Sequence, residues 1–231
     1  MISHKHKCIF LHIPKCGGTT IKYLLFPNET VSWDKVDYNK LYGWCPKRKF
    51  FLQHATAKQL LETELISEEI WQNYYKFTFI RNPWDRAVSD YFWLMKDQKI
   101  TDTFKNYILK QGKFKAFLTH ESKLYYRGDH TKQQTEFFDY DGNFKPDFIG
   151  RFESYNNNLK QIFDALKLPY VQDLHVNKAK VKKKHYSNYF FNDVQLAFQD
   201  LYKDDIDKLG YNFENKQDVF FKMKNFFRKN D

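Results

Sequence analysis

The chain has 231 residues, of which 42% are hydrophobic and 19% aromatic, and it carries a formal net charge of +10. This apolar content suffices for a packed core and excludes a globally disordered chain. The basic excess suggests an anionic partner (a nucleic acid, a phosphorylated cofactor, an acidic polysaccharide or a membrane surface), and a generally basic solvated surface is the alternative.

Short apolar segments alternate with segments of helical periodicity along the chain. Strands are predicted at 7–13, 49–53, 76–80 and 147–152. Helices are predicted at 17–26, 55–75 (one or two), 84–96, the second half of 147–168, and 193–211. This alternation predicts an α/β fold with a mostly parallel central sheet flanked by helices. Because no repeat or long linker interrupts the pattern, we expect one domain over 1–231.

Basic residues follow the predicted strands at the points where the strands end. Lys15, His54, Arg81 and Arg151 all occupy such positions. Ligands of parallel sheets bind at the carboxyl ends of the strands. We therefore expect these four side chains to converge on one crevice.

The segment PKCGGTT at 14–20 lies between the first strand and the first helix. Gly17 and Gly18 lack Cβ atoms, so backbone N–H groups can approach a ligand closely. The start of the helix adds free N–H groups and a partial positive charge, which favour an anion. Lys15 supplies a full charge, and Thr19 and Thr20 supply hydroxyl groups. An ordinary glycine-rich turn is the alternative for this segment.

Three cysteines, Cys8, Cys16 and Cys45, are present without a CxxC pair. Their odd number disfavours a disulfide framework and their spacing gives no zinc signature, which indicates a reducing compartment. The apolar run IFLHI is too short for a signal-peptide core or a membrane span. We expect a cytoplasmic protein without a membrane span; the Golgi lumen stays open if an N-terminal anchor has been removed.

Four segments resemble motifs of the carbohydrate sulfotransferases, the family that includes heparan sulfate 2-O-sulfotransferase. HIPKCGGTT is similar to that family's HIPKTGGTS, and FTFIRNPWDRAVSDYF (77–92) to its strand–loop–helix motif. FIGRFESYNNNLKQI (148–162) and YKDDIDKLGYNF (202–213) resemble two further segments of the family. The four segments occur in the family's order and extend over nearly the whole chain.

This resemblance implies a P-loop-like fold that binds 3′-phosphoadenosine 5′-phosphosulfate (PAPS) and releases 3′-phosphoadenosine 5′-phosphate (PAP). It implies that the loop holds the 5′-phosphosulfate, and that Arg81 and Ser89 hold the 3′-phosphate. The loop residues carried over are Lys15, Cys16, Gly17, Gly18, Thr19 and Thr20. Cys16 replaces the family's usual threonine, so a contact from that side chain is in question. It also implies that no metal is required.

Transfer to a hydroxyl group needs charge stabilisation at the leaving oxygen and benefits from a general base. Lys15 suits the first role. His54 is the predicted base, because histidine titrates near neutrality and the family has a histidine in a comparable stretch. His130 and Gln134 resemble the family's HxxxQ segment and are predicted to contact the acceptor. His12 lies inside the first predicted strand and is expected to be structural.

The predicted activity is sulfuryl transfer from PAPS to a hydroxyl group, with a carbohydrate or another hydroxylated molecule as acceptor and no specific nucleic acid as partner. A basic nucleic-acid-binding protein without catalytic activity is the alternative, supported by the charge and the lysine run at 180–184. That run fits a solvated loop, a flap over the cofactor or a track for an acidic acceptor. A magnesium-dependent kinase is disfavoured, because the lysine precedes the glycines and no GK[ST] occurs. The sequence leaves the oligomeric state undetermined.

Overall fold

The structure, a computed structural model, describes residues 1–27, 29–120, 126–168 and 184–218. The described residues form two compact units. The first unit lies within Met1–Arg81 and Phe117–Lys178, and the second within Asn82–Ala116 and Ala179–Asp231. The expectation of a single domain over 1–231 stays a prediction.

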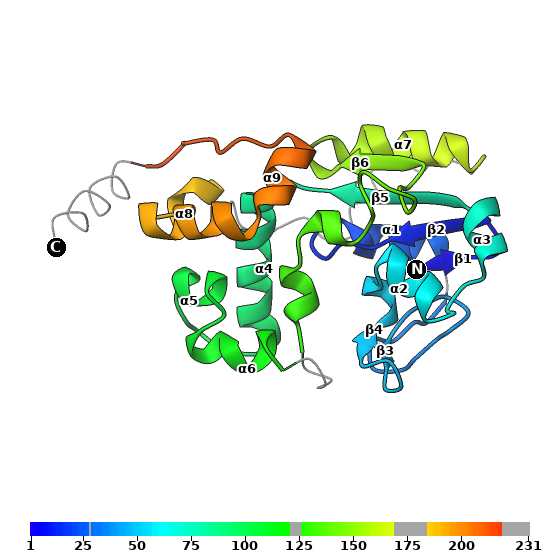
Figure 1. Ribbon diagram of the computed structural model, residues 1–231, viewed down its shortest axis with the longest axis horizontal. Coiled ribbons are helices and arrows are strands. Elements are labelled where there is room, and N and C mark those ends of the chain that lie inside the picture. The colour runs from blue at the N-terminus through cyan, green and yellow to red at the C-terminus, as the bar shows by residue number, and fades with distance from the viewer. Residues whose placement is uncertain (28, 121–125, 169–183, 219–231) are drawn as a thin grey trace, which may run out of the picture. The chain divides into compact units, whose positions relative to one another are not determined.

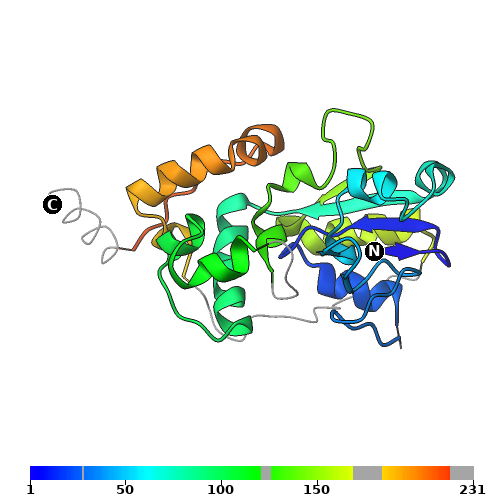
Figure 2. The same ribbon diagram turned by 60° about the horizontal axis from the view of Figure 1, so that its bottom comes forward.

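The first unit is built on a four-stranded sheet with the order β1-β2-β5-β6. Its strands are β1 (Ile2–Ser3), β2 (Cys8–Leu11), β5 (Tyr75–Ile80) and β6 (Phe148–Arg151). β1 is antiparallel to β2, whereas β2–β5 and β5–β6 are parallel. Figure 2 shows the dark-blue N-terminal strands beside the teal β5. The predicted α/β class with a mostly parallel sheet is confirmed.

The parallel strands β2 and β5 are almost entirely buried. All four residues of β2 are buried, and so are five of the six residues of β5. The one polar side chain at the centre of β5 is satisfied, because the Thr78 hydroxyl donates to the Leu11 carbonyl oxygen at 2.7 Å. Such strands read as continuous apolar runs, which is why the sequence located them.

Helices flank the sheet of the first unit (Figure 1). They are α1 (Gly18–Leu25), α2 (Ala57–Glu62), α3 (Glu68–Asn73) and α7 (Tyr155–Ala165). Short 3₁₀ turns carry several functional residues: η1 (Leu52–His54), η3 (Gly128–Thr131), η4 (Gln134–Glu136) and η5 (Phe152–Ser154). The segment predicted as one or two helices at 55–75 contains two, since the side chains of Thr56 and Ser67 each cap a helix start.

The strand predicted at 49–53 is not part of the central sheet. Only Phe50–Phe51 (β4) is extended, and it pairs antiparallel with Trp44–Cys45 (β3) in a separate two-stranded sheet. Four residues separate Cys45 from Phe50. Parallel pairing needs a crossover of about a dozen residues or more, so this short link permits only a hairpin. His54 therefore reaches the site from a hairpin and the 3₁₀ turn η1, not from a sheet strand.

The second unit is helical around an aromatic core. Its elements are α4 (Pro83–Asp97), α5 (Phe104–Ile108), η2 (Gly112–Phe114), η6 (Tyr186–Tyr189), α8 (Asn192–Leu201) and α9 (Lys203–Leu209). The short helix α6 (Lys115–Leu118) contains the point where the chain passes between units. Fully buried rings fill this core: Trp84, Tyr107, Phe114, Phe190 and Phe198.

The single helix predicted at 193–211 is wrong, because it breaks at Tyr202. This residue adopts φ −118° and ψ 28°, outside the helical region, and separates α8 from α9. Its ring stacks on Phe198 with a centroid separation of 4.2 Å. The predicted end near Gly210 is confirmed, since this glycine closes α9 in the left-handed conformation.

Most of the predicted basic loop at 176–186 lies outside the described residues, including Lys180, Lys182 and Lys183. Lys184 is described, and its ammonium pairs with Asp218 at 2.7 Å. All three cysteines are buried and free, which fits the prediction that no disulfide framework exists. Within the described ranges, every helix is too short or too polar to cross a bilayer. The cytoplasmic location stays a prediction.

Candidate active site

The anion loop (residues 14–20) connects the end of β2 to α1 and contains two residues in left-handed conformations. Gly17, the N-cap of α1, has φ 90°, and Lys15 has φ 68°. Positive φ is ordinary for glycine and uncommon for lysine. No acidic residue stands in the first turn of α1. The first N–H groups of this helix therefore face no carboxylate of their own helix.

Both glycines of the loop lie where a side chain would collide with a ring. A Cβ on Gly18 would lie 1.9 Å from Nε2 of His12. A Cβ on Gly17 would lie 2.4 Å from the Tyr155 ring. The glycines therefore serve packing within the protein as well as backbone access to a ligand.

Hydrogen bonds from Tyr155 fix the second half of the loop. Its hydroxyl donates to the Gly17 carbonyl oxygen at 2.9 Å and also bonds the Thr20 side chain. Thr20 is buried, whereas Thr19 is exposed. The hydroxyl of Thr19 is thus the more accessible of the two predicted ligand-binding hydroxyl groups.

Arg81 lies beside the anion loop, as expected of two residues at the carboxyl edge of neighbouring strands. Its Nη1 donates to the Lys15 carbonyl oxygen at 2.9 Å. The guanidinium carbon also lies 4.3 Å from the centroid of the Phe152 ring. The structure therefore brings Lys15 and Arg81 together through the loop backbone.

Gln134 joins the end of β5 to the same loop. Its Oε1 accepts from the Arg81 N–H, and its Nε2 donates to the Arg81 carbonyl oxygen, both at 2.8 Å. The Cys16 thiol also lies 3.6 Å from this Oε1. Gln134 is completely buried. The acceptor contact predicted for Gln134 is untested, and its geometry favours a positioning role toward Arg81 and Cys16.

A histidine cluster, formed by His12, His54 and His130, lies next to the loop. The ring of His54 stands edge-on to that of His12 at 4.9 Å and to that of His130 at 5.2 Å. The first strand was predicted at 7–13, but in the structure β2 ends at Leu11. His12 therefore follows the strand and belongs to the cluster. Nδ1 of His54 lies 2.5 Å from Oδ2 of Asp129.

Burial and neighbouring charges shift the pKa values of His12, His54 and Asp129. Burial lowers the pKa of His54, an effect that the Asp129 carboxylate opposes. Burial lowers the pKa of His12 well below its ordinary value. Burial alone would raise the pKa of Asp129, but its interactions with His54, His130 and Arg127 bring it down to about 2. Near neutral pH, His12 and His54 are therefore neutral beside an ionised Asp129.

His54, Asp129 and His130 each offer a potential ligand atom, and these atoms lie within 4.8 Å of one another. That spacing is within reach of a metal ion. However, Nδ1 of His54 and Oδ2 of Asp129 already bond each other. The hydrogen bond links two members of this trio, and the expectation that no metal is needed stays a prediction.

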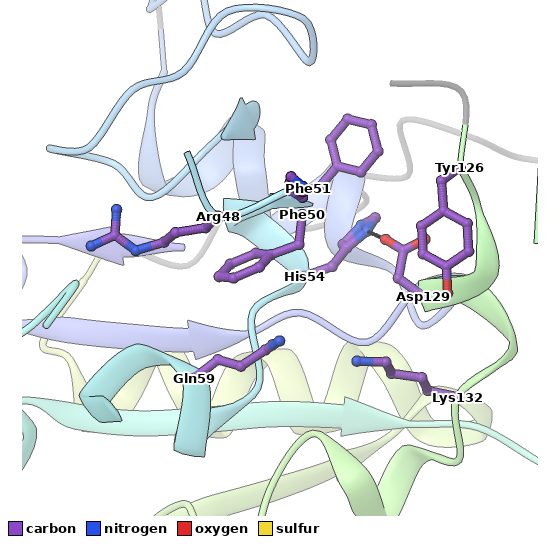
Figure 3. Close-up of a pocket in the computed structure, with 9 residues that line it drawn as sticks. Arg48, Phe50, Phe51, His54, Gln59, Tyr126, Asp129 and Lys132 are labelled. Atoms are coloured by element: carbon purple, nitrogen blue, oxygen red, sulfur yellow. Dashed lines mark hydrogen bonds and ion pairs between the residues drawn. The ribbon is translucent and has the colours of Figure 1, made fainter. Parts of the chain in front are cut away.

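A pocket of about 400 Å³ opens beside His54 and Asp129. Figure 3 shows Lys132 and Gln59 pointing into it below the bonded His54–Asp129 pair. Its wall combines basic, aromatic and polar side chains: Arg48, Lys49, Phe50, Phe51, His54, Gln59, Tyr126, Asp129 and Lys132. This combination suits a polar ligand with a flat face and a negative charge.

For two predicted site residues, membership of this site stays a prediction. Ser89 lies in α4 of the second unit, so its pairing with Arg81 on one phosphate stays a prediction. Arg151 ends β6 and is exposed, with its N–H bonded to Asn158 at 2.6 Å. The sequence analysis missed Asp129 and Tyr155. Asp129 precedes His130 directly, and that pairing of an acid with a histidine was the available signal.

The chain was compared with protein families, curated proteins and solved structures. A family model described as the sulfotransferase family matches residues 1–212. No curated protein and no solved structure matches the chain. The match covers every element of the site described above.

The contact between Gly18 and His12 gives a direct test of the packing. Gly18→Ala should lower the free energy of unfolding by about 1–3 kcal/mol, the usual cost of overpacking. Replacing the ring as well, in His12→Ala/Gly18→Ala, should recover part of that loss, because the added methyl group gains space. Urea denaturation of both single variants and the double variant measures the coupling. Strict additivity of the two changes would contradict the close contact.

Proposed function

The chain belongs to the sulfotransferase family, and from that premise we propose that it moves a sulfuryl group from PAPS to a hydroxyl group of a carbohydrate. The donor and the acceptor class are the parts of this proposal that go beyond family membership. Support comes from three neighbouring features of the first unit: the anion loop, the histidine cluster and the basic aromatic pocket.

The anion loop fits the phosphosulfate end of PAPS. Gly17 and Gly18 leave the backbone open where any side chain would collide with Tyr155 or His12. The helix start supplies N–H donors, and Lys15 supplies a positive charge. Arg81, hydrogen-bonded to the loop, adds a planar guanidinium suited to phosphate oxygens. The Thr19 hydroxyl is exposed on the same turn.

When bound, PAPS supplies the sulfuryl group and an anionic leaving group, PAP. The bond from the acceptor oxygen to sulfur forms as the bond from sulfur to the bridging phosphate oxygen breaks. Lys15 stabilises the negative charge that develops on that phosphate oxygen. His54 accepts the proton released by the hydroxyl group, and its lowered pKa keeps it unprotonated near neutral pH.

The basic aromatic pocket is the proposed acceptor site, because His54 lines it. Phe50, Phe51 and Tyr126 offer apolar rings that can cover the flat face of a sugar, while Arg48 and Lys132 favour an acidic group. A volume of about 400 Å³ fits one or two sugar rings rather than a long buried chain. A carbohydrate that already carries a negative charge satisfies both properties.

The observation that carries the proposal is the meeting of the loop and the cluster. Gly18 begins α1 against the ring of His12, and His12 lies against His54. A group held by the loop would therefore be close to the proposed base. The family match gives no support to the alternative of a nucleic-acid-binding protein without catalytic activity.

PAP should stabilise the protein against heat, because a ligand that binds only the folded state adds about 2.7 kcal/mol at a hundred times its Kd. Lys15→Ala should remove most of this shift by removing the loop's charge. Lys58→Ala, at an exposed lysine of α2, should preserve it. Differential scanning fluorimetry with and without PAP measures both. No shift in the parent protein at millimolar PAP would refute the donor site.

His54→Ala should retain the PAP-dependent shift and lose about 10²- to 10⁴-fold in kcat, the usual contribution of a general base. The exposed histidine at 120 provides the matched control, since His120→Ala should leave kcat unchanged. The measurement is transfer of radiolabelled sulfate from PAPS across a panel of carbohydrates and small alcohols. A His54→Ala enzyme with full activity would exclude this residue as the base.

Lys132→Ala should raise KM for an anionic carbohydrate about tenfold, equivalent to about 1.4 kcal/mol, with little change for a neutral one. The reason is that Lys132 lines the pocket without contributing to the proposed chemistry. Steady-state kinetics with both acceptors measures the difference, and Lys58→Ala again serves as control. An equal change in KM for charged and neutral acceptors would argue against an acidic acceptor.

A further inference from the structure

A buried carboxylate pairs with the proposed base from a distant part of the sequence. Asp129 lies in η3, and its Oδ2 is 2.5 Å from Nδ1 of His54. Both side chains are only 11% exposed. Burying a carboxylate costs free energy unless its charge is compensated. The hydrogen bond to His54 provides part of that compensation.

The pairing determines which nitrogen of His54 carries its proton. Because the pKa of Asp129 is lowered to about 2, its carboxylate is ionised and accepts hydrogen bonds only. Nδ1 of a neutral His54 must then be the donor, and Nε2 keeps its lone pair. The bonded ring therefore presents an acceptor nitrogen on the side away from Asp129.

We infer that Asp129 is a positioning residue for sulfuryl transfer, which holds His54 in the tautomer whose Nε2 can accept the proton of the acceptor hydroxyl. The inference rests on the proposed function of His54 as base. In the step, the proton leaves the acceptor oxygen for Nε2 as that oxygen bonds to sulfur. The resulting imidazolium forms beside the Asp129 carboxylate, which stabilises its charge.

The other groups around His54 make this carboxylate electrostatically important. His12 faces His54 from the end of β2, His130 from η3, and Arg127 from the residue that precedes η3. Of these, His130 and Arg127 disfavour a positive charge on His54. Asp129 is the anion among the described groups that act on the pKa of His54. Without it, the imidazolium formed during transfer would lose its hydrogen-bonded counter-charge.

The second carboxylate oxygen of Asp129 also supports a role in the site. Oδ1 is buried and has no hydrogen-bond partner within the described residues. Asp129 lines the same pocket as His54 (Figure 3). An orphan buried oxygen is unusual in a purely structural carboxylate. It is free to accept a hydrogen bond from a water molecule or from an acceptor hydroxyl group.

The test is the pH dependence of transfer by Asp129→Asn. Protonated His54 cannot act as a base, so the rate of the parent enzyme should fall as the pH decreases through the pKa of His54. The Asp129 carboxylate raises that pKa. In Asp129→Asn the acid limb of kcat/KM should therefore move to lower pH, and kcat should fall at least about tenfold. The thermal shift caused by PAP should be unchanged.

Two controls separate positioning from structure. Asp139→Asn, at an exposed carboxylate of the same unit, should change neither the acid limb nor kcat. A lower melting temperature of Asp129→Asn with an unmoved acid limb and full kcat would show a structural role only and overturn the inference. Loss of parent activity on chelation, restored by zinc, would also overturn it by making the trio a metal site.

Nitrogen-15 NMR of the histidine side chains tests the tautomer in the parent protein, so it does not require Asp129→Asn to fold. In the parent protein His54, assigned by its absence from His54→Ala, should show a protonated Nδ1 and an unprotonated Nε2 above the pH of the acid limb. The opposite tautomer would overturn the inference even if transfer occurs. If the parent protein neither binds PAP nor transfers sulfate, the proposed function fails, whereas the tautomer result still decides the pairing.

Discussion

The contact between Gly18 and His12 is the constraint on which the rest of the site depends. Gly18 starts α1 so close to the imidazole that no Cβ fits between them. His12 packs in turn against His54. The anion loop and His54, the proposed base, are thus held together by packed rings. Such preorganisation is what transfer between two bound groups requires.

Positive charges and neutral imidazoles occupy different parts of the site. Lys15 and Arg81 carry charges at the loop, whereas burial keeps His12 and His54 neutral. Gln134 crosslinks the loop and β5 with an uncharged amide, so it satisfies the Arg81 backbone without neutralising the guanidinium. A carboxylate in this position would weaken the attraction for an anionic donor. The acid bonded to the cluster is Asp129, which faces His54.

Local sequence signals predicted the parts of the fold that local forces determine. The apolar runs at β2 and β5 are almost wholly buried and that of β6 is partly buried, and such runs are visible without a structure. The glycine-rich loop was also visible in the sequence, because a lysine, two glycines and two threonines stand together between a predicted strand and a predicted helix. Segment 49–53 misled, since an apolar run alone does not distinguish a sheet strand from a hairpin arm. The break at Tyr202 was also missed, because the helical spacing of apolar residues continues from α8 into α9.

By itself the sequence determined the α/β class, the anion loop and its family, since these are encoded by periodicity and by motifs contiguous in the chain. Only the tertiary structure decided which residues share the site. Asp129 reaches His54 across 75 positions, and Tyr155 reaches Gly17 across 138. Neither partner changes the local pattern of the other. These hydrogen bonds form only when the folded chain brings distant segments together. Contacts between residues so far apart in the chain therefore leave no pattern in a single sequence.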